Sequence, residues 1–214
     1  MDLAAPLRSL IPSVDSAALE VLAGSESGLS ASTIARLASR GSRQGLTKAL
    51  DRLVEHGLVI AEPANRGFLY RLNRDHVLAE ALLLALGARL RLFERIRGAV
   101  EQLDPTPVHA GLFGSFARAD GGPGSDIDLL LVTPSGLDLF NDGWQDQLSA
   151  LGVRVLAWTG NRLECLVLTA DTFAAAVRDQ EPIVASLLEE STYVLGQPLH
   201  ELVAEPDRRN GGRR

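Results

Sequence analysis

The first part of the chain carries hydrophobic patterns typical of helices and then of strands. Apolar residues at helical spacing predict helices over residues 17–22, 31–37 and 42–56. Two short apolar runs, 58–60 and 68–72, flank a polar segment containing proline and glycine, and they predict a hairpin. Three helices followed by a hairpin are therefore expected to form the first structural unit.

A long amphipathic pattern follows the predicted hairpin. Apolar residues recur every three or four positions and predict one helix over residues 75–103. Asp104-Pro105 is expected to end it, because the residue before proline avoids the helical conformation. The helix either packs within its own chain or pairs with its copy in a homodimer.

The remaining sequence consists of short apolar runs separated by turns, which predicts a small α/β domain. Strands are expected over 108–113, 127–132, 153–158 and 163–168. Helices are expected over 144–151, from a cap at Thr169 or Asp171 through Val177, and over 183–190 after Glu181-Pro182. The fold class is α+β, divided into residues 1–73, a linker helix at 74–104, a domain at 105–205 and a disordered tail at 206–214.

Composition narrows the function classes. The net charge is −6, but residues 1–104 carry 13 Lys and Arg against 12 Asp and Glu, whereas residues 105–214 carry 8 against 15. The acidic second half repels nucleic acid at long range and suits a site that gathers cations. No stretch approaches the roughly 18 consecutive apolar residues of a membrane span. The single cysteine and the absence of a basic secretory signal favour a cytoplasmic protein without a membrane partner.

Candidate chemistry is concentrated between residues 111 and 132. Asp126 and Asp128 are two positions apart, so on an extended backbone they project to the same face. They follow a Gly114-Ser115 turn, where glycine lets the backbone approach a phosphate and the serine hydroxyl can bond its oxygens. The pattern favours a site for divalent metal and a polyphosphate.

These residues resemble the nucleotidyltransferase superfamily of the DNA polymerase beta type, particularly the minimal nucleotidyltransferases of bacteria and archaea. The family pattern, Gly-Ser-x-Ala-Arg and then Ser-Asp-x-Asp-Leu, is matched by residues 114–118 and 125–129. The resemblance implies transfer of a nucleoside monophosphate, AMP from ATP being expected, to a hydroxyl acceptor with two Mg²⁺ ions. It assigns Asp126 and Asp128 to the metal ions. It assigns nucleotide binding to Gly114, Ser115, Arg118 and Ser125.

The family normally has a third acidic residue on a later strand, which completes a metal site and can act as general base. Glu164 is the best candidate, because its strand could neighbour 127–132. The family more often uses aspartate at this position. Asp171 is the alternative, although it lies where a helix cap is expected. Glu164 could also be a solvent-facing charge on an edge strand.

The first unit resembles a winged helix-turn-helix domain of bacterial transcriptional regulators. That resemblance makes 42–56 the recognition helix and places Arg66 at the wing tip, near a phosphate or the minor groove. The helix residues that could contact DNA are Arg43, Gln44, Thr47, Lys48 and Arg52. Alternatively, these are ordinary solvated positions, and the unit is a dimerisation or docking module.

Two functions are consistent with these resemblances. The first is an Mg-dependent nucleotidyltransferase coupled to a DNA-binding domain, acting on a protein, RNA or small molecule. A partner toxin is among the expected protein acceptors, because small family members act as antitoxins. The second is a DNA-binding transcriptional regulator whose nucleotidyltransferase domain senses nucleotide or is inactive. Intact Ser115, Asp126 and Asp128 favour the enzyme, whereas an uncertain third carboxylate favours the sensor.

Overall fold

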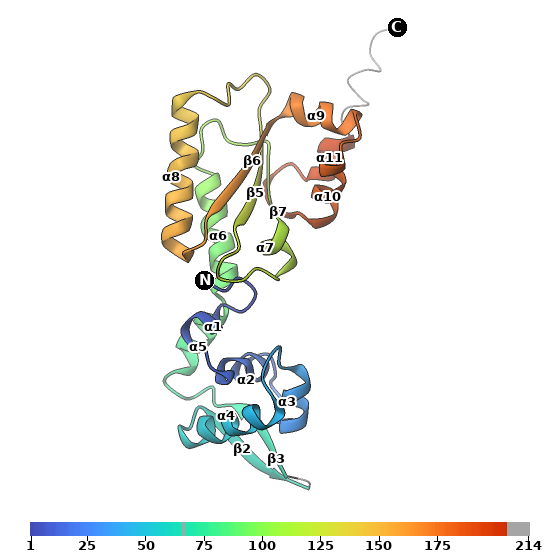
Figure 1. Cartoon of the computed structure of the whole chain (residues 1–214). Coiled ribbons are helices and arrows are strands. Elements are labelled where there is room, and N and C mark those ends of the chain that lie inside the picture. Colours follow the sequence, from blue (N-terminus) through green and yellow to red (C-terminus); the bar gives the residue numbers. More distant parts are fainter. Residues whose placement is uncertain (66, 205–214) are drawn as a thin grey trace. The chain divides into compact units, whose positions relative to one another are not determined.

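The computed structural model describes residues 1–65 and 67–204 and divides the chain into two compact units. The first unit comprises Asp2 and residues 4–89, and the second comprises Met1, Leu3 and the chain from Leu90 onward (Figure 1). No helix among the described residues is long and apolar enough to cross a membrane. Each unit is described by itself.

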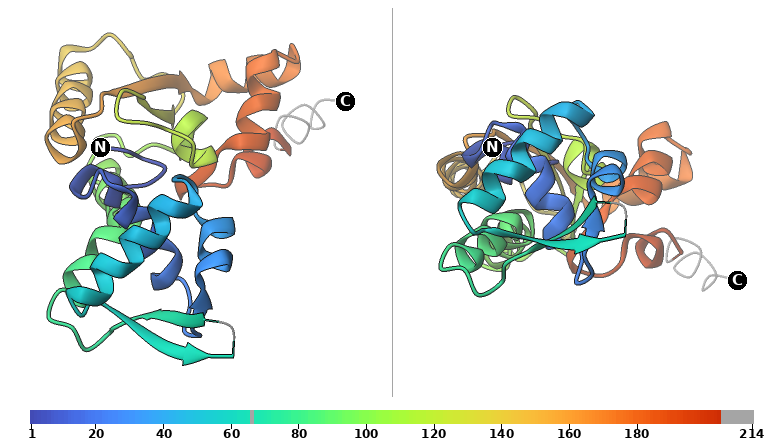
Figure 2. Two further views of the ribbon diagram at one scale, coloured as in Figure 1. Left: turned by 60° about the horizontal axis from the view of Figure 1, so that its bottom comes forward. Right: turned by 90° about the horizontal axis from the view of Figure 1, so that it is seen from below.

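The first unit combines helices with a small antiparallel sheet. Its helices are α1 (Leu7–Leu10), α2 (Val14–Ala23), α3 (Ala31–Leu37), α4 (Arg43–Glu55) and α5 (Ala79–Leu86), and its strands are β1 (Leu29–Ser30), β2 (Val59–Ala64) and β3 (Gly67–Leu72). The strand order is β1-β3-β2, with both pairs antiparallel. The hairpin β2–β3 lies beneath α4 in Figure 1 and in the left view of Figure 2. The predicted helices over 17–22, 31–37 and 42–56 and the hairpin are confirmed.

Local capping explains where these helices begin and end. The Ser30 hydroxyl accepts a hydrogen bond from the Thr33 N–H, and the Ser42 hydroxyl accepts one from the Gly45 N–H. Gly57 follows α4 with φ of +73°, a conformation that glycine adopts without steric cost. The enclosed core includes Leu22, Ile34 and Leu50.

The expectation of one helix over 75–103 is wrong. The segment forms α5 (Ala79–Leu86) and α6 (Ala88–Val100), separated at Gly87. The Gly87 N–H donates to the Leu83 carbonyl, which closes α5. Glycine inside a helix costs about 1 kcal/mol relative to alanine, so the hydrophobic pattern alone did not secure continuity.

The second unit is built on a four-stranded mixed sheet, which confirms the expected small mixed sheet. Its elements after α6 are β4 (His109–Phe113), α7 (Gly114–Arg118), β5 (Ile127–Thr133), α8 (Asp142–Thr159), β6 (Leu163–Thr169), α9 (Ala170–Arg178), α10 (Pro182–Glu190), β7 (Thr192–Gly196) and α11 (Leu199–Ala204). The order is β6-β5-β4-β7; β5 and β6 are parallel, and the other pairs are antiparallel.

Helices cover both faces of this sheet. Ile127 of β5 packs in a cluster with Ile96 of α6 and Trp144 of α8. Leu130, which points to the opposite face, packs with Phe173 of α9. Figure 1 shows α6 and α8 on one side of the sheet and α9, α10 and α11 on the other. Alternate side chains of β5 therefore pack into two hydrophobic cores, one on each face of the sheet.

The expected strand over 153–158 is wrong, because these residues complete α8. Leu151 and Val155, four positions apart, are fully buried, whereas Val153 is 67% exposed. This burial follows the helical period and not the alternation of a strand. β6 consequently pairs directly with β5, and β7, which the sequence did not predict, covers the free side of β4.

The other predicted elements of the second unit are confirmed. β6 ends at Thr169, whose hydroxyl accepts from the Thr172 N–H and caps α9, so Thr169 and not Asp171 is the cap. α10 begins at Pro182, as expected for proline in a first turn. The expected disorder of 206–214 lies outside the described residues.

Candidate functional site

The strand register brings two of the predicted carboxylates together. Asp128 of β5 lies directly opposite Glu164 of β6 in the parallel pair. Adjacent strands are about 4.8 Å apart, and residues in register share a face, so both side chains emerge on the same side. Asp126 precedes β5 by one residue and shares the face of Asp128 by the two-residue period. Asp171 lies in the first turn of α9, at the opposite end of β6.

Electrostatics supports this grouping. Burial raises the pKa of the Asp128 carboxyl, and the negative charges of Asp126 and Glu164 raise it further. The Arg118 guanidinium acts in the opposite direction and lowers the pKa of Asp128. The four side chains therefore lie within electrostatic range, and the surplus of negative charge would be relieved by a bound cation.

Gly114 lies directly against the carboxylate of Asp128. β4 ends at Phe113, the residue paired with Asp128, and Gly114 follows with φ of +62°. A Cβ atom at Gly114 would lie 2.2 Å from Oδ2 of Asp128, closer than any normal contact. Only glycine fits here without moving the carboxylate. The expected turn at Gly114-Ser115 is the start of the short helix α7.

The two predicted serines have different surroundings. The Ser115 hydroxyl lies 3.5 Å from the Asp126 carbonyl, to which it donates. The Ser125 hydroxyl accepts a hydrogen bond of 2.9 Å from the Gly122 N–H. The Ser115 hydroxyl thus lies beside the backbone of Asp126, whereas the Ser125 hydroxyl is engaged in closing the loop that leads to it.

Arg118 has two acidic partners. Its Nε donates to Asp120 at 3.2 Å and its Nη1 donates to Glu190, the last residue of α10, at 2.6 Å. Hydrogen bonds and charge from Asp120, and then from Glu190, raise the pKa of Arg118. Sequence reasoning missed Glu190, because nothing in the local pattern of α10 links it to α7.

The donor types suit a hard cation. Asp126, Asp128 and Glu164 offer carboxylate oxygens, the ligands that Mg²⁺ prefers. Within the described residues, no three His, Cys, Asp or Glu side chains form a ready-made metal site. Cys165, next to Glu164, points to the opposite face. Burial and the Glu164 charge raise the pKa of its thiol to about 12, so it stays protonated.

The match to a known family covers this region. Residues 93–179 match the nucleotidyltransferase domain family. The matched region begins within α6, ends one residue after α9 and includes Gly114, Asp126, Asp128 and Glu164. Glu190 lies beyond it. A crystal structure of a toxin-antitoxin with AMP-PNP is similar at 13% identity and a TM-score of 0.39, over 55% of this chain and 85% of that chain. No curated protein matches the chain.

The residues predicted to contact DNA lie on α4 and are exposed: Arg43, Gln44, Thr47, Lys48 and Arg52. Arg52 is paired within its own unit, because its Nη2 donates to both oxygens of Asp15 at 2.9 and 2.8 Å. Burial acts to raise the pKa of Asp15, but hydrogen bonds from Arg52 and Ser13 outweigh it and lower the pKa. Arg66 lies outside the described residues.

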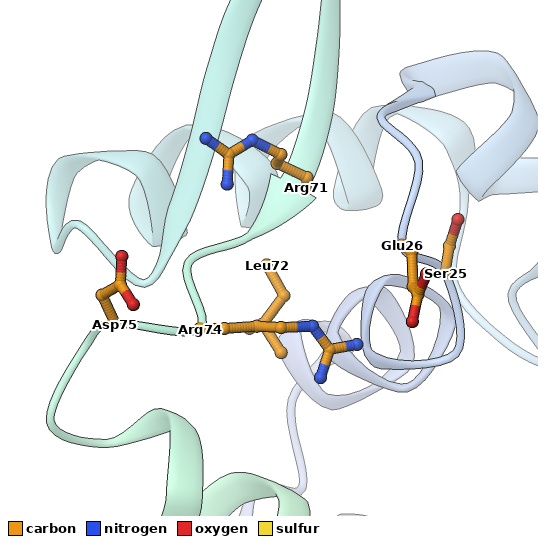
Figure 3. A pocket seen from close by; sticks show the side chains of 6 residues that line it. All are labelled: Ser25, Glu26, Arg71, Leu72, Arg74 and Asp75. Carbon is orange, nitrogen blue, oxygen red and sulfur yellow. The ribbon is translucent and has the colours of Figure 1, made fainter.

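A pocket of about 250 Å³ in the first unit does not coincide with this surface. It is lined by Ser25, Glu26, Arg71, Leu72, Arg74 and Asp75 (Figure 3). Arg71 donates to Glu62 at 2.9 Å, and Arg74 donates to the Ala23 carbonyl at 3.1 Å while extending toward Glu26. Because both signs of charge line it, the pocket does not select an anionic ligand.

Proposed function

We propose that the second unit is an Mg-dependent nucleotidyltransferase that moves a nucleoside monophosphate, AMP from ATP being the expected group, to a hydroxyl acceptor. The observation that carries the proposal is the register of Asp128 with Glu164, next to position 114, where only glycine fits without moving the Asp128 carboxylate. The nucleotidyltransferase family match over residues 93–179 supports it.

In this proposal Asp126, Asp128 and Glu164 would hold Mg²⁺, which would supply positive charge to offset that of the triphosphate and to polarise the attacking oxygen. The acceptor oxygen forms a bond to the α-phosphorus while the bond to the leaving pyrophosphate breaks. Glu164, whose carboxylate is exposed, takes the proton of the acceptor hydroxyl. Gly114 allows close approach of the phosphates, and the Ser115 hydroxyl donates to a phosphate oxygen.

Arg118 is proposed to hold the triphosphate. An arginine has five N–H donors, of which Asp120 and Glu190 engage one each. The remaining donors can face a phosphate in bidentate geometry. The triphosphate would compete with the two carboxylates for the guanidinium, so the pairs with Asp120 and Glu190 set part of the nucleotide affinity.

The test is transfer of label from α-labelled ATP to a cell-lysate acceptor in the presence of Mg²⁺. Asp126→Asn and Asp128→Asn should abolish transfer. Glu164→Gln should lower it strongly, whereas Asp171→Asn, the matched control, should not. The assay is repeated with α-labelled GTP, CTP and UTP. If the unsubstituted protein transfers label from none of the four nucleotides, the proposed enzymatic activity is refuted. Retained nucleotide binding without transfer would instead favour the sensor.

We also propose that the first unit binds DNA as a winged helix-turn-helix domain. The supporting observation is α4, on which Arg43 and Lys48 are both exposed and which is followed by the β2–β3 hairpin. Arg43→Ala and Lys48→Ala should weaken salt-dependent binding to the protein's own promoter. Arg74→Ala, which removes an arginine of the same unit outside α4 and the β2–β3 hairpin, is the control. Equal loss in the control would contradict a recognition role for α4.

A further inference from the structure

The loop that leads to Asp126 is rich in glycine, and its internal hydrogen bonds join only Gly122 and Ser125 among the described residues. Three of the four residues at 121–124 are glycines, which lose more conformational freedom on ordering than any other residue. Asp126 is exposed and lies just outside β5, so its own side chain contributes no packing. The place of its carboxylate therefore depends on contacts made to the loop by other segments.

Leu3 makes one of those contacts, because its N–H donates to the Gly121 carbonyl at 2.9 Å, and Asn161 makes the contacts nearest to Asp126. Asn161 follows α8 and is only 2% exposed, and its Nδ2 donates to the Ser125 carbonyl at 2.9 Å and to the Gly122 carbonyl at 3.4 Å. The Ser125 carbonyl belongs to the peptide group that joins it to Asp126. On the other side of Asp126, the Ile127 N–H donates to the Arg162 carbonyl at 2.8 Å. Residues 161 and 162 thus hold the peptide groups on both sides of Asp126.

The side chain of Asn161 is fixed by its remaining bonds. Its Oδ1 accepts from the Met1 nitrogen at 2.8 Å, and its backbone N–H donates to the Thr159 hydroxyl at 2.9 Å. Both ends of the amide are therefore paired, which assigns the nitrogen to the loop. Buried, fully paired polar groups are costly to remove and hold one geometry.

We propose that Asn161 is a positioning residue for the candidate metal site, acting through the Ser125–Asp126 peptide. The proposal rests on the proposed function, since it takes Asp126 as a metal ligand. By itself, Asn161 after Gly160 indicates only a turn in the sequence. Its hydrogen bonds to the loop give it a second role, which is to convert a glycine-rich segment into a fixed support for a carboxylate.

Two substitutions separate this role from simple packing. Asn161→Ala removes every side-chain contact. Asn161→Asp keeps the size and the oxygen facing Met1 but lacks the amide N–H donors to Gly122 and Ser125. The control is Thr133→Val, which removes a hydroxyl that is likewise fully buried, at the far end of β5.

The first measurement needs neither metal nor nucleotide. Hydrogen exchange of the full chain should be faster at residues 121–127 in both Asn161 variants, and unchanged there in Thr133→Val. Unchanged exchange in the Asn161 variants would overturn the proposal, because the loop would then be held by something else.

The second measurement is the Mg²⁺ dependence of label transfer. A misplacement of about 1 Å can cost up to about 100-fold in rate, so both Asn161 variants should lose about 10-fold or more in kcat. The half-saturating Mg²⁺ concentration should rise about as much, while KM for the nucleotide at saturating Mg²⁺ changes little. Variants that behave like Thr133→Val in an active protein overturn the inference. If the unsubstituted protein transfers no label, the proposed function fails and the metal-site role of Asn161 fails with it, whereas hydrogen exchange still decides whether Asn161 holds the loop.

Discussion

Replacing Gly114 with alanine should disable the candidate site while leaving the fold intact. The added Cβ would lie 2.2 Å from Asp128 Oδ2 and 3.1 Å from its Cγ. Since non-bonded atoms prefer about 3.5 Å, the carboxylate has to move by about 1 Å. Displacement of a catalytic group by that distance can lower the rate up to about 100-fold, so kcat should fall about 10- to 100-fold.

Gly136→Ala is the matched control. Gly136 has φ of +78°, comparable to +62° at Gly114, but an added Cβ there meets no atom within 4 Å. Both variants therefore carry the strain of a left-handed alanine, about 1–2 kcal/mol, which corresponds to a fall in Tm of a few degrees for a chain of this size. Only Gly114→Ala carries the contact with Asp128.

Thermal unfolding and label transfer from α-labelled ATP should be measured on the same preparations. We expect similar small decreases in Tm for the two variants and a selective loss of transfer in Gly114→Ala. If the two variants transfer label at the same rate, the Asp128 carboxylate is not needed where the structure has it, and the reasoning about the close fit fails.

Three further results are expected. Glu190→Gln should lower the nucleotide KM up to about five-fold, because exposed ion pairs are worth up to about 1 kcal/mol and Arg118 would lose one competitor; a higher KM would mean that Glu190 helps to hold Arg118 in place. Arg52→Ala and Asp15→Asn should each lower the free energy of unfolding by at most about 1 kcal/mol. The double variant should lose no more unfolding free energy than either single variant, because both remove the same ion pair. Additive losses in denaturant titrations would contradict a direct pair. Burial lowers the pKa of His109 in the folded chain, so the unfolded chain takes up the proton first as the pH falls. The free energy of unfolding should therefore decrease below about pH 6.5, by about 1.4 kcal/mol for each unit of difference between the two pKa values. If urea titrations at pH 5 show the same decrease in His109→Gln, the decrease comes from another group.

Local signals predicted much of the fold. Ser30 and Ser42 cap the helices predicted over 31–37 and 42–56, and capping of this kind depends on only a few adjacent residues. The strand predicted for the segment containing Val153 and Val155 was wrong, because a short apolar run fits a strand period as well as a helical one. Burial distinguishes the two, because Val153 is exposed between the buried Leu151 and Val155, which fits α8 and not a strand.

The candidate site also combines residues that the sequence reveals with contacts that it does not. Gly114, Asp126 and Asp128 belong to one continuous motif and could be found from the sequence. The contacts of Glu190 with Arg118 and of Asn161 with the loop join segments that are far apart in the chain. Such contacts arise from the packing of α10 against α7 and from the order of the strands, so no local pattern encodes them.

The parallel pairing of β5 with β6 has a consequence for how this chain tolerates insertions and deletions. The separation between Asp128 and Glu164 is set by the backbone hydrogen bonds of the two strands, and the length of the connecting helix α8 does not enter it. Residues added to or removed from the loop between β5 and α8 should therefore leave the two carboxylates side by side. A single residue inserted within β6 before Glu164 would send that side chain to the opposite face of the sheet. The loop between β5 and α8 can thus vary in length, whereas the segment from Asn161 to Glu164 cannot.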